Sequence, residues 1–314
     1  IYICLRDSLG QTTELSKEIR YINNKVSDTW DFASLEDVQI NRSQFESTVI
    51  EDLLTLSSST KSVILIKNDK LVFENHFNDT PEDYLNTCWS VTKSISSMII
   101  GIAIDKGYIT SVNQTMDEFF PEVFNTGKYE DKKAITLDHV LTMTAGIPDD
   151  PTIQLLSEDL FATAFDFDLH IELGVDWEYS STGSHILSGI ITNTTGMNMA
   201  SFAESHLFSP LGITNYTWDT DGEGNNNGGY GSHFHPRDMA KFGYLFLKQG
   251  KWNGEQIISS EWVANSTSEK IPLLTDIGYA YQWWTDKTDN CSYFSAQGMY
   301  GQYIGVFPQL DLVF

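Results

Sequence analysis

The chain has 314 residues, of which 41% are hydrophobic and 20% are charged, so it is long enough to bury a substantial core and too apolar to be disordered. The 43 acidic residues outnumber the 19 basic ones, which gives a formal net charge of −24. An acidic surface of this strength repels phosphate backbones and anionic lipid headgroups, and it therefore excludes nucleic acid as a partner. No apolar run approaches the ~20 residues that cross a bilayer, so we expect a soluble protein without a membrane span.

Cysteine and histidine positions indicate neither a disulfide framework nor a metal site. The three cysteines, Cys4, Cys88 and Cys291, have no metal-ligand spacing, and only a single bridge between Cys4 and Cys291 remains open. His233 and His235 have no acidic or cysteine partner at a supporting position, so no metal is predicted. Because the sequence begins without a methionine, we expect an exported and processed protein, either periplasmic or secreted.

The first third of the chain predicts a helix, a hairpin and a second helix. Apolar residues at spacings of three and four predict an amphipathic helix over Ser43–Leu56, capped by Ser43. Two β-branched segments, Lys61–Lys67 and Leu71–Phe77, flank a short polar turn and predict an antiparallel hairpin. The segment Ser90–Gly107 is apolar on most sides, which predicts a buried helix that ends at the glycine.

The middle of the chain consists of short helical patterns and polar loops. It includes Asp219–Gly229, a stretch of Asp, Asn and Gly that predicts a flexible loop over a cleft. An amphipathic helix is then predicted at Arg237–Gln249. Aromatic and alternating runs predict antiparallel strands at Tyr279–Trp284, Cys291–Gln297, Gln302–Phe307 and Leu310–Phe314.

These patterns predict an α/β (α+β) fold, in which an antiparallel sheet is flanked by helices and carries an inserted all-helical lobe. The sheet domain is discontinuous and comprises residues 1–107 and 236–314, and the helical lobe comprises residues 108–235. Because an apolar strand ending at Phe314 would leave an exposed sheet edge, we expect a further C-terminal segment.

The first candidate for catalysis is Ser90-Val91-Thr92-Lys93, at the start of the buried helix. The spacing of three puts Ser90 and Lys93 side by side, and the helix N-terminus offers N–H groups to an oxyanion formed on an attacked carbonyl. A lysine on such an apolar helix is partly desolvated, so its neutral form can accept the serine proton. By itself the pattern also fits a serine N-cap followed by a lysine that reaches the surface.

Two further segments supply polar groups for such a centre. Tyr179, at a loop-to-helix corner, can bridge the nucleophile and the leaving group through its hydroxyl, with its pKa held down by Lys93. In Ala296-Gln297-Gly298-Met299 the glycine lets a strand edge pass close to a substrate, and the N–H of Met299 is a candidate oxyanion donor. A packing tyrosine and an ordinary glycine turn are the alternatives.

Together, the segments SVTK from Ser90, Tyr179-Ser180-Ser181 and Ala296-Gln297-Gly298 resemble, in order and relative position, the three motifs of the beta-lactamase-related serine hydrolases. That family includes class C beta-lactamases, DD-peptidases, family VIII carboxylesterases and nylon-oligomer hydrolases. The similarity covers most of the chain and includes Leu141–Ile147 and His235–Leu247.

The resemblance implies a beta-lactamase/transpeptidase-like fold and a role for each motif residue. Ser90 would form the acyl-enzyme, Lys93 would be its general base, and Tyr179 would pass the proton to the leaving group. The N–H groups of Ser90 and Met299 would form the oxyanion hole, and no cofactor is implied. The substrate pocket would be lined by Ser181, Gln297 and Gly298.

Two departures from the beta-lactamase pattern bear on the substrate. The second motif reads Tyr-Ser-Ser rather than Tyr-x-Asn, and the third reads Ala-Gln-Gly rather than Lys-Thr-Gly. The missing lysine would pair with the carboxylate of a penicillin or a D-Ala-D-Ala peptide, a contact worth roughly 1.5–3 kcal/mol. We therefore expect a small-molecule carboxylic ester or amide as the substrate. The candidates for an apolar or aromatic acyl pocket are Trp177, Tyr230, Tyr279, Trp283 and Trp284, and packing in the core is the alternative for each of them.

Two alternatives to an ester or amide hydrolase stay open. A beta-lactamase or DD-peptidase would use the same residues, and nitrocefin turnover approaching ester turnover would favour it. A binding or scaffold protein would keep the fold without catalysis, and a fluorophosphonate probe would then leave Ser90 unlabelled. The oligomeric state is not indicated by the sequence.

Overall fold

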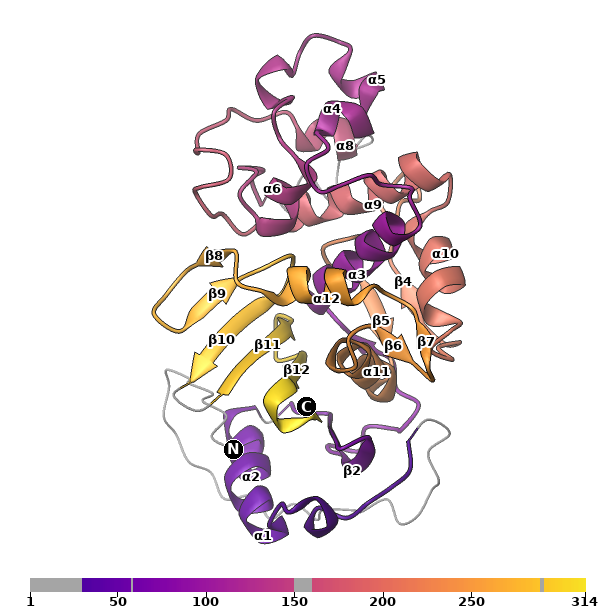
Figure 1. The fold of residues 1–314 in the computed structure, drawn as a ribbon, viewed down its shortest axis with the longest axis vertical. Coiled ribbons are helices and arrows are strands. Elements are labelled where there is room, and N and C mark those ends of the chain that lie inside the picture. The colour runs from indigo at the N-terminus through magenta and orange to yellow at the C-terminus, as the bar shows by residue number, and fades with distance from the viewer. Residues whose placement is uncertain (1–29, 58, 150–159, 289–290) are drawn as a thin grey trace.

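An eight-stranded antiparallel sheet crosses the computed structural model, which describes residues 30–57, 59–149, 160–288 and 291–314 (Figure 1). Strands from the beginning and the end of this part of the chain lie side by side in the sheet. The sheet and its flanking helices confirm the predicted α/β (α+β) fold class. In order across the sheet, the strands are β2 (Lys70–His76), β1 (Ser62–Lys67), β13 (Leu312–Val313), β12 (Tyr303–Phe307), β11 (Cys291–Gln297), β10 (Trp284–Thr288), β9 (Ile277–Tyr279) and β8 (Ile271–Pro272).

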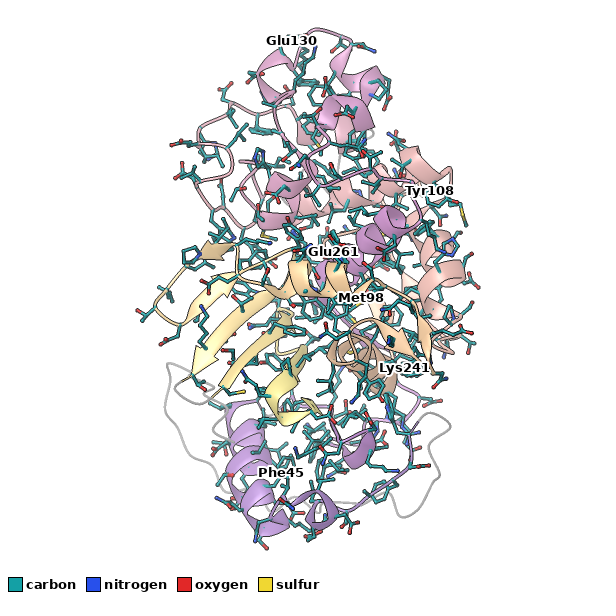
Figure 2. The ribbon with its side chains drawn as sticks, in the orientation of Figure 1. Phe45, Met98, Tyr108, Glu130, Lys241 and Glu261 are labelled. Atoms are coloured by element: carbon teal, nitrogen blue, oxygen red, sulfur yellow. The ribbon has the colours of Figure 1, made fainter. Side chains whose placement is uncertain are left out.

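Both faces of the sheet are covered, as alternate residues of β1 show. Ile64 and Ile66 pack in the main core, which includes α3 (Val91–Asp105) and α11 (Pro236–Leu247). Val63 and Leu65 point the other way, into a second core with the N-terminal helix. Figure 2 shows Met98 of α3 near the centre of the molecule and Phe45 of the N-terminal helix toward one end.

The remaining helices lie mostly on one side of the sheet. Figure 1 shows α4, α5, α6 and α8 gathered at one end, with α9 and α3 between them and the sheet. These helices are α4 (Met116–Phe119), α5 (Pro121–Phe124), α6 (Leu137–Thr142), α8 (Leu160–Ala164), α9 (Ser181–Thr195), α10 (Met199–Ala203) and α12 (Ser260–Thr267). The boundaries proposed for the helical lobe, residues 108–235, stay a prediction.

Several short elements complete the fold. A three-stranded sheet has the order β3 (Asn86–Thr87), β5 (Ser232–Phe234) and β4 (Thr217–Trp218), and a hairpin pairs β6 (Lys251–Trp252) with β7 (Glu255–Gln256). Single turns of 3-10 helix occur at Glu36–Val38, Glu130–Lys132 and Pro308–Leu310, and a π-helical turn at Glu204–Phe208. None of the helices in the described ranges combines the length and apolarity needed to cross a membrane.

The predicted N-terminal helix is confirmed, but its predicted cap is wrong. The helix consists of α1 (Arg42–Phe45), a π-helical stretch at Glu46–Ile50 and α2 (Glu51–Leu56). Its cap is Asn41, whose side chain accepts a hydrogen bond from the N–H of Gln44 at 2.9 Å. Ser43 lies inside the first turn, where its hydroxyl cannot serve as the cap.

The predicted continuous strand over Tyr279–Trp284 is also wrong, because Tyr279 ends β9, Trp284 begins β10, and residues 280–283 form the turn between them. Gln282, at its tip, has a φ of 64°, and its N–H donates to the carbonyl oxygen of Leu141 at 3.1 Å. The turn is buried against α6 and α9, so its aromatic residues are as apolar as those of a strand. Because this turn is buried, its sequence lacks the polar residues that normally indicate a turn.

The last predicted strand is present as β13, but it is not at an edge. It pairs with β1 through Val313 and Ile66, and with β12 through Val313 and Val306. Its apolar residues are buried between two neighbours, which corrects the expectation of an exposed edge at this strand. The bridge that the sequence left open between Cys4 and Cys291 involves Cys4, which lies outside the described residues.

Candidate active site

The N-terminus of α3 carries two polar residues at the edge of the core. Ser90 is the N-cap residue, and Lys93 is one turn into the helix with only 1% of its surface exposed. The Lys93 Nζ lies 3.1 Å from Ser90 Oγ, so the structure brings the two predicted residues together. Burial lowers the pKa of Lys93 from 10.5 to about 7, although the negative charge of Asp149 opposes the shift.

Three oxygen atoms surround the Lys93 amine. They are Ser90 Oγ at 3.1 Å, Ser181 Oγ at 3.0 Å and the carbonyl oxygen of Gly229 at 2.8 Å. A neutral amine has two N–H groups and one lone pair, and the Gly229 carbonyl can only accept. When Ser181 accepts the second N–H, the lone pair is directed at Ser90 and can accept the hydroxyl proton.

Tyr179 lies beside the same two residues. Its hydroxyl hydrogen-bonds with Ser90, and the Lys93 Nζ is 4.9 Å from the centroid of its ring. Burial raises the pKa of Tyr179 to about 12, although the hydrogen bond with Ser90 opposes this and the charge of Asp149 adds to it. The expectation that Lys93 lowers this pKa is therefore wrong. Tyr179 is a neutral phenol that can donate a proton.

The start of α9 presents Ser181 to the amine. Ser180 caps this helix by accepting a hydrogen bond from the N–H of Gly183 at 2.8 Å. The N–H of Ser181 donates to Asp149 Oδ1 at 2.9 Å. The exposed carboxylate of Asp149 is thus held near the site, where its negative charge raises the pKa values of Lys93 and Tyr179. Asp149 was not predicted as a site residue, because a single aspartate in a loop carries no motif.

The end of β11 lies against the residue that precedes Trp89 and Ser90. A Cβ atom on Gly298 would be 2.6 Å from the carbonyl oxygen of Cys88, so only glycine allows this approach. Met299 follows in the turn to β12. Within the described ranges, the N–H groups of Ser90 and Met299 have no hydrogen-bond acceptor in the protein, and both are available to a ligand.

The side chain of Gln297 makes its hydrogen bond within its own strand. Its side-chain amide donates to Ser295 Oγ at 2.9 Å. No hydrogen bond between Gln297 and the Ser90, Lys93 or Tyr179 side chains is found in the described part of the chain. A contact with substrate stays a prediction for this residue.

Aromatic rings surround Tyr179. The ring centroid of Trp177 lies 6.1 Å from that of Tyr179, and the Trp284 ring stacks on Tyr179 at 6.3 Å. Tyr279 is buried behind them, 5.1 Å from Trp284. Trp283 is fully buried in the core and is removed from the acyl-pocket candidates. The candidates that keep exposed surface are Trp177, Tyr230 and Trp284.

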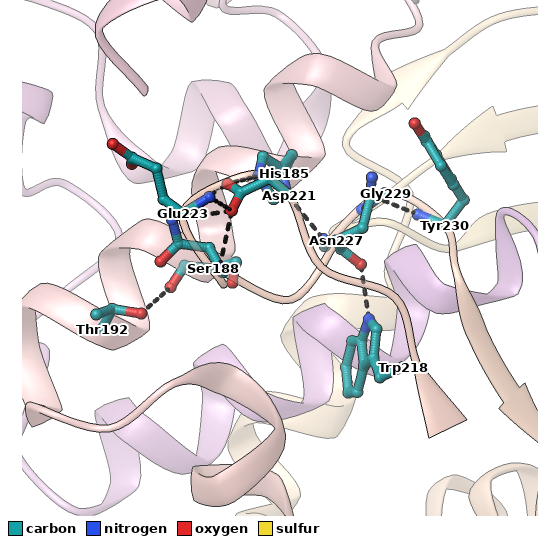
Figure 3. Close-up of polar contacts among 11 residues, drawn as sticks. His185, Ser188, Thr192, Trp218, Asp221, Glu223, Asn227, Gly229 and Tyr230 are labelled. Atoms are coloured by element: carbon teal, nitrogen blue, oxygen red, sulfur yellow. Dashed lines mark hydrogen bonds and ion pairs between the residues drawn. The ribbon is translucent and has the colours of Figure 1, made fainter. Parts of the chain in front are cut away.

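Gly229 is the main site residue that was not predicted from the sequence. The loop predicted to be flexible is exposed only in its first half, because Asn226–Gly229 is buried between α3 and α9 (Figure 3). Cβ atoms on Gly228 and Gly229 would lie 2.5 Å and 2.6 Å from backbone oxygens of α9. Two adjacent glycines are a sign of such close approach, and this signal was available in the sequence.

Of the two histidines with alternate spacing, His235 contacts polar groups that are not metal ligands. His235 lies within hydrogen-bonding distance of the Asn215 side chain, at 3.0 Å, and of the Tyr84 carbonyl oxygen, at 3.3 Å. Among the residues whose positions are described, no group of three or more His, Cys, Asp or Glu side chains is arranged to hold a metal ion.

Comparison with known proteins covers most of the chain. The profile of the Beta-lactamase family matches residues 48–314. The 6-aminohexanoate-dimer hydrolase of Paenarthrobacter ureafaciens is 25% identical over 286 residues, which cover 81% of this chain and 71% of that protein.

Solved structures share the fold at lower sequence identity. A Bacillus anthracis protein, provisionally described as a 6-aminohexanoate-dimer hydrolase, has a TM-score of 0.74 and 22% identity, covering 94% of this chain and 84% of its own. The octameric penicillin-binding protein homologue from Pyrococcus abyssi has a TM-score of 0.71 and 19% identity, covering 87% of this chain and 72% of its own. These similarities confirm the predicted beta-lactamase/transpeptidase-like fold.

Proposed function

The chain belongs to the Beta-lactamase family, and from this premise we propose that it is a serine hydrolase that cleaves carboxylic esters or small amides through an acyl-serine intermediate. The observation that supports this most directly is the 3.1 Å contact between the buried Lys93 amine and the Ser90 hydroxyl. An amine with a pKa of about 7 is largely uncharged above neutral pH, and it is next to the proton that it has to accept.

Acylation uses the four groups described above. The lone pair of Lys93 accepts the Ser90 proton while Ser90 Oγ forms a bond to the substrate carbonyl carbon. The carbonyl oxygen becomes an oxyanion, which the N–H groups of Ser90 and Met299 stabilise. Tyr179 donates its proton to the departing alkoxide or amine as that bond breaks, and Lys93 returns a proton to the phenolate. The products of this half-reaction are the acyl-enzyme and the alcohol or amine.

Deacylation reverses the proton transfers with water as the nucleophile. A water molecule gives a proton to Lys93 and forms a bond to the acyl carbon, again with the oxyanion at the two N–H groups. Ser90 Oγ leaves and recovers a proton, and the carboxylic acid is released. No cofactor takes part in either half.

The third motif and the aromatic rings around Tyr179 support the proposed substrate class. Without a lysine at this motif, a substrate carboxylate loses a contact worth roughly 1.5–3 kcal/mol, so esters and small amides are favoured over penicillins. Trp177 and Trp284 flank Tyr179 and favour an apolar or aromatic acyl group. A relative named as a 6-aminohexanoate-dimer hydrolase supports a small-molecule substrate.

Hydrolysis of p-nitrophenyl butyrate by the wild-type protein and single variants tests the proposal. We expect Ser90→Ala and Lys93→Ala to lower kcat by about 1000-fold or more. Ser97→Ala is the matched control, because Ser97 is on the same helix, is buried, and makes no side-chain hydrogen bond within the described residues. If Ser90→Ala hydrolyses the ester as fast as the wild type, the proposal is wrong.

A beta-lactamase is the second candidate, since the matching family profile bears that name. Nitrocefin turnover by the wild type, measured beside the ester, distinguishes the two. We expect nitrocefin to be the poorer substrate because the third motif lacks its lysine. Labelling of Ser90 by a fluorophosphonate probe, located by mass spectrometry, would argue against a binding protein without catalysis.

A further inference from the structure

A buried histidine–aspartate pair, His185 and Asp221, contacts the loop segment that also contacts Lys93, and Figure 3 shows the pair. His185 on α9 is fully buried, and the Asp221 side chain is 4% exposed. His185 Nε2 lies 3.1 Å from Asp221 Oδ2. Burial by itself would raise the pKa of Asp221, but hydrogen bonds from His185 and Asn225 outweigh it and lower that pKa to about 2. Asp221 is therefore a carboxylate at any pH at which the protein is expected to work.

The hydrogen bonds of His185 fix its tautomer. The N–H of Gly228 donates to His185 Nδ1 at 3.1 Å, so Nδ1 carries no proton. The ring proton is then on Nε2, where it is donated to Asp221. Asp221 Oδ1 is occupied in turn by the N–H groups of Glu223 and Asn225, both at 2.9 Å. The pair thus presents a fixed acceptor to the backbone of Gly228.

This acceptor holds the segment that contacts the Lys93 amine. The carbonyl oxygen of Gly228 accepts from Ser96 Oγ at 2.8 Å, and the next carbonyl, of Gly229, accepts from Lys93 Nζ at 2.8 Å. The Asn227 side chain accepts from the N–H of Gly229 at 3.0 Å. These bonds hold the peptide groups on both sides of Gly229. Rotation of the peptide group between residues 228 and 229, or of that between residues 229 and 230, would therefore move the Gly229 oxygen away from the Lys93 amine.

We propose that His185 and Asp221 are positioning residues for the Lys93 base, and that they act through Gly228 and the carbonyl of Gly229. The inference rests on the proposed function, because it gives a role to the direction of the Lys93 lone pair. The Gly229 carbonyl takes one N–H of the neutral amine and leaves the lone pair for Ser90. Loss of that carbonyl lets the amine turn, so the rate of acylation falls while substrate binding is retained.

Three variants separate the two ends of the imidazole. In His185→Asn the side-chain oxygen replaces Nδ1 and still accepts from Gly228, whereas in His185→Gln the amide nitrogen replaces Nε2 and this acceptor is lost. In Asp221→Asn an N–H group is directed either at His185 or at the backbone N–H groups of residues 223 and 225. We expect His185→Gln and Asp221→Asn to lower kcat for p-nitrophenyl butyrate by about 10- to 100-fold with little change in KM. His185→Asn retains most of the activity.

Asp238→Asn is the matched control for loss of a buried carboxylate. Asp238 Oδ1 lies 2.7 Å from Lys241 Nζ, both side chains are almost fully buried, and neither touches the site. We expect this variant to lose thermal stability and to keep kcat. Each variant is assayed at a temperature at which circular dichroism shows it folded, and the two His185 variants decide the question if Asp221→Asn does not fold.

The possible results distinguish failure of the positioning role from failure of the proposed function. A folded His185→Gln or Asp221→Asn protein with wild-type kcat overturns the positioning role. So does a fall in kcat that follows melting temperature across all four variants, including Asp238→Asn, because that pattern indicates general destabilisation. If the wild type neither hydrolyses the ester nor is labelled at Ser90, the proposed function fails and the positioning role fails with it.

Discussion

The ring of Trp89 packs edge-on against the ring of Tyr300, with centroids 5.4 Å apart and planes at 69°. Trp89 precedes Ser90 and Tyr300 follows Met299, so the contact joins the two turns that carry the proposed oxyanion donors. Both residues have positive φ, 46° for Trp89 and 75° for Tyr300, a conformation that costs about 1–3 kcal/mol at each residue. The surrounding structure holds both turns in place, and the ring contact contributes to that restraint.

Truncation of Tyr300 should therefore affect rate more than stability. Because Tyr300 is 73% exposed, Tyr300→Ala should change the free energy of unfolding by no more than about 0.5 kcal/mol. It removes the contact that aligns Met299 with Ser90, so we expect kcat for p-nitrophenyl butyrate to fall about 10-fold or more. Tyr300→Phe keeps the ring and should behave as the wild type. Equal losses in the two variants would assign the effect to the phenol hydroxyl instead.

The pH dependence of hydrolysis should report the protonation of Lys93. The base acts when neutral, so kcat/KM should fall tenfold per pH unit below the Lys93 pKa of about 7. The carboxylate of Asp149 raises that pKa, and Asp149→Asn should move the acid limb to lower pH. Glu255→Gln, on the exposed hairpin β6–β7, is the charge-matched control and should not move it. An acid limb that stays in place or moves upward in Asp149→Asn would contradict this account.

The buried Lys93 amine should also make the free energy of unfolding depend on pH. In the unfolded chain Lys93 titrates near 10.5 and in the folded protein near 7, so between these values the unfolded state binds the extra proton. The contribution of Lys93 to the free energy of unfolding therefore increases as pH rises from 7 toward 10.5, by at most about 1.4 kcal/mol per pH unit. Lys93→Met lacks this contribution. Urea unfolding of both proteins at pH 7, 8 and 9 should show the wild type gaining relative to the variant, and a constant difference would be evidence against the depressed pKa.

Glycine substitutions within one loop should separate backbone strain from displacement of the Gly229 carbonyl. In Gly229→Ala the new Cβ would lie 2.6 Å from the carbonyl oxygen of Ser181, so the segment has to shift and the contact with Lys93 is lost. We expect both a lower melting temperature and a kcat reduced about 10-fold or more. Gly224→Ala introduces a side chain at a φ of 88° with no atom within 4 Å. It should lower stability and leave kcat unchanged. Activity retained in Gly229→Ala would remove this carbonyl from the mechanism.

Local sequence pattern was sufficient for the elements that carry the first two site residues. The apolar run after Ser90 predicts α3, and the spacing of three places Lys93 beside the hydroxyl whatever the rest of the fold does. The hairpin β1–β2 was predicted on the same basis, since its alternation and its polar turn are both local. These features depend only on neighbours in the chain.

The features that were missed depend on residues distant in the chain. Gly229 meets Lys93 across 136 positions, and no pattern within the loop indicates that its carbonyl is an acceptor. The turn around Gln282 is buried by α6 and α9, so its composition resembles that of a strand. The raised pKa of Tyr179 comes from burial by rings of other segments, among them Trp284. Tertiary packing decides each of these, and a single sequence does not display it.

The pairing of β1 with β13 has a consequence for how the chain folds. About 250 residues separate Ile66 from Val313, and a contact of this range is slow to close because the entropy cost of ordering the intervening chain comes before the contact stabilises it. Until then the apolar edge of β1 is open to pairing with other chains, which makes aggregation the competing reaction during synthesis or refolding. The strand order therefore predicts that the native state recovers slowly after dilution from denaturant, and that the recovery depends on protein concentration.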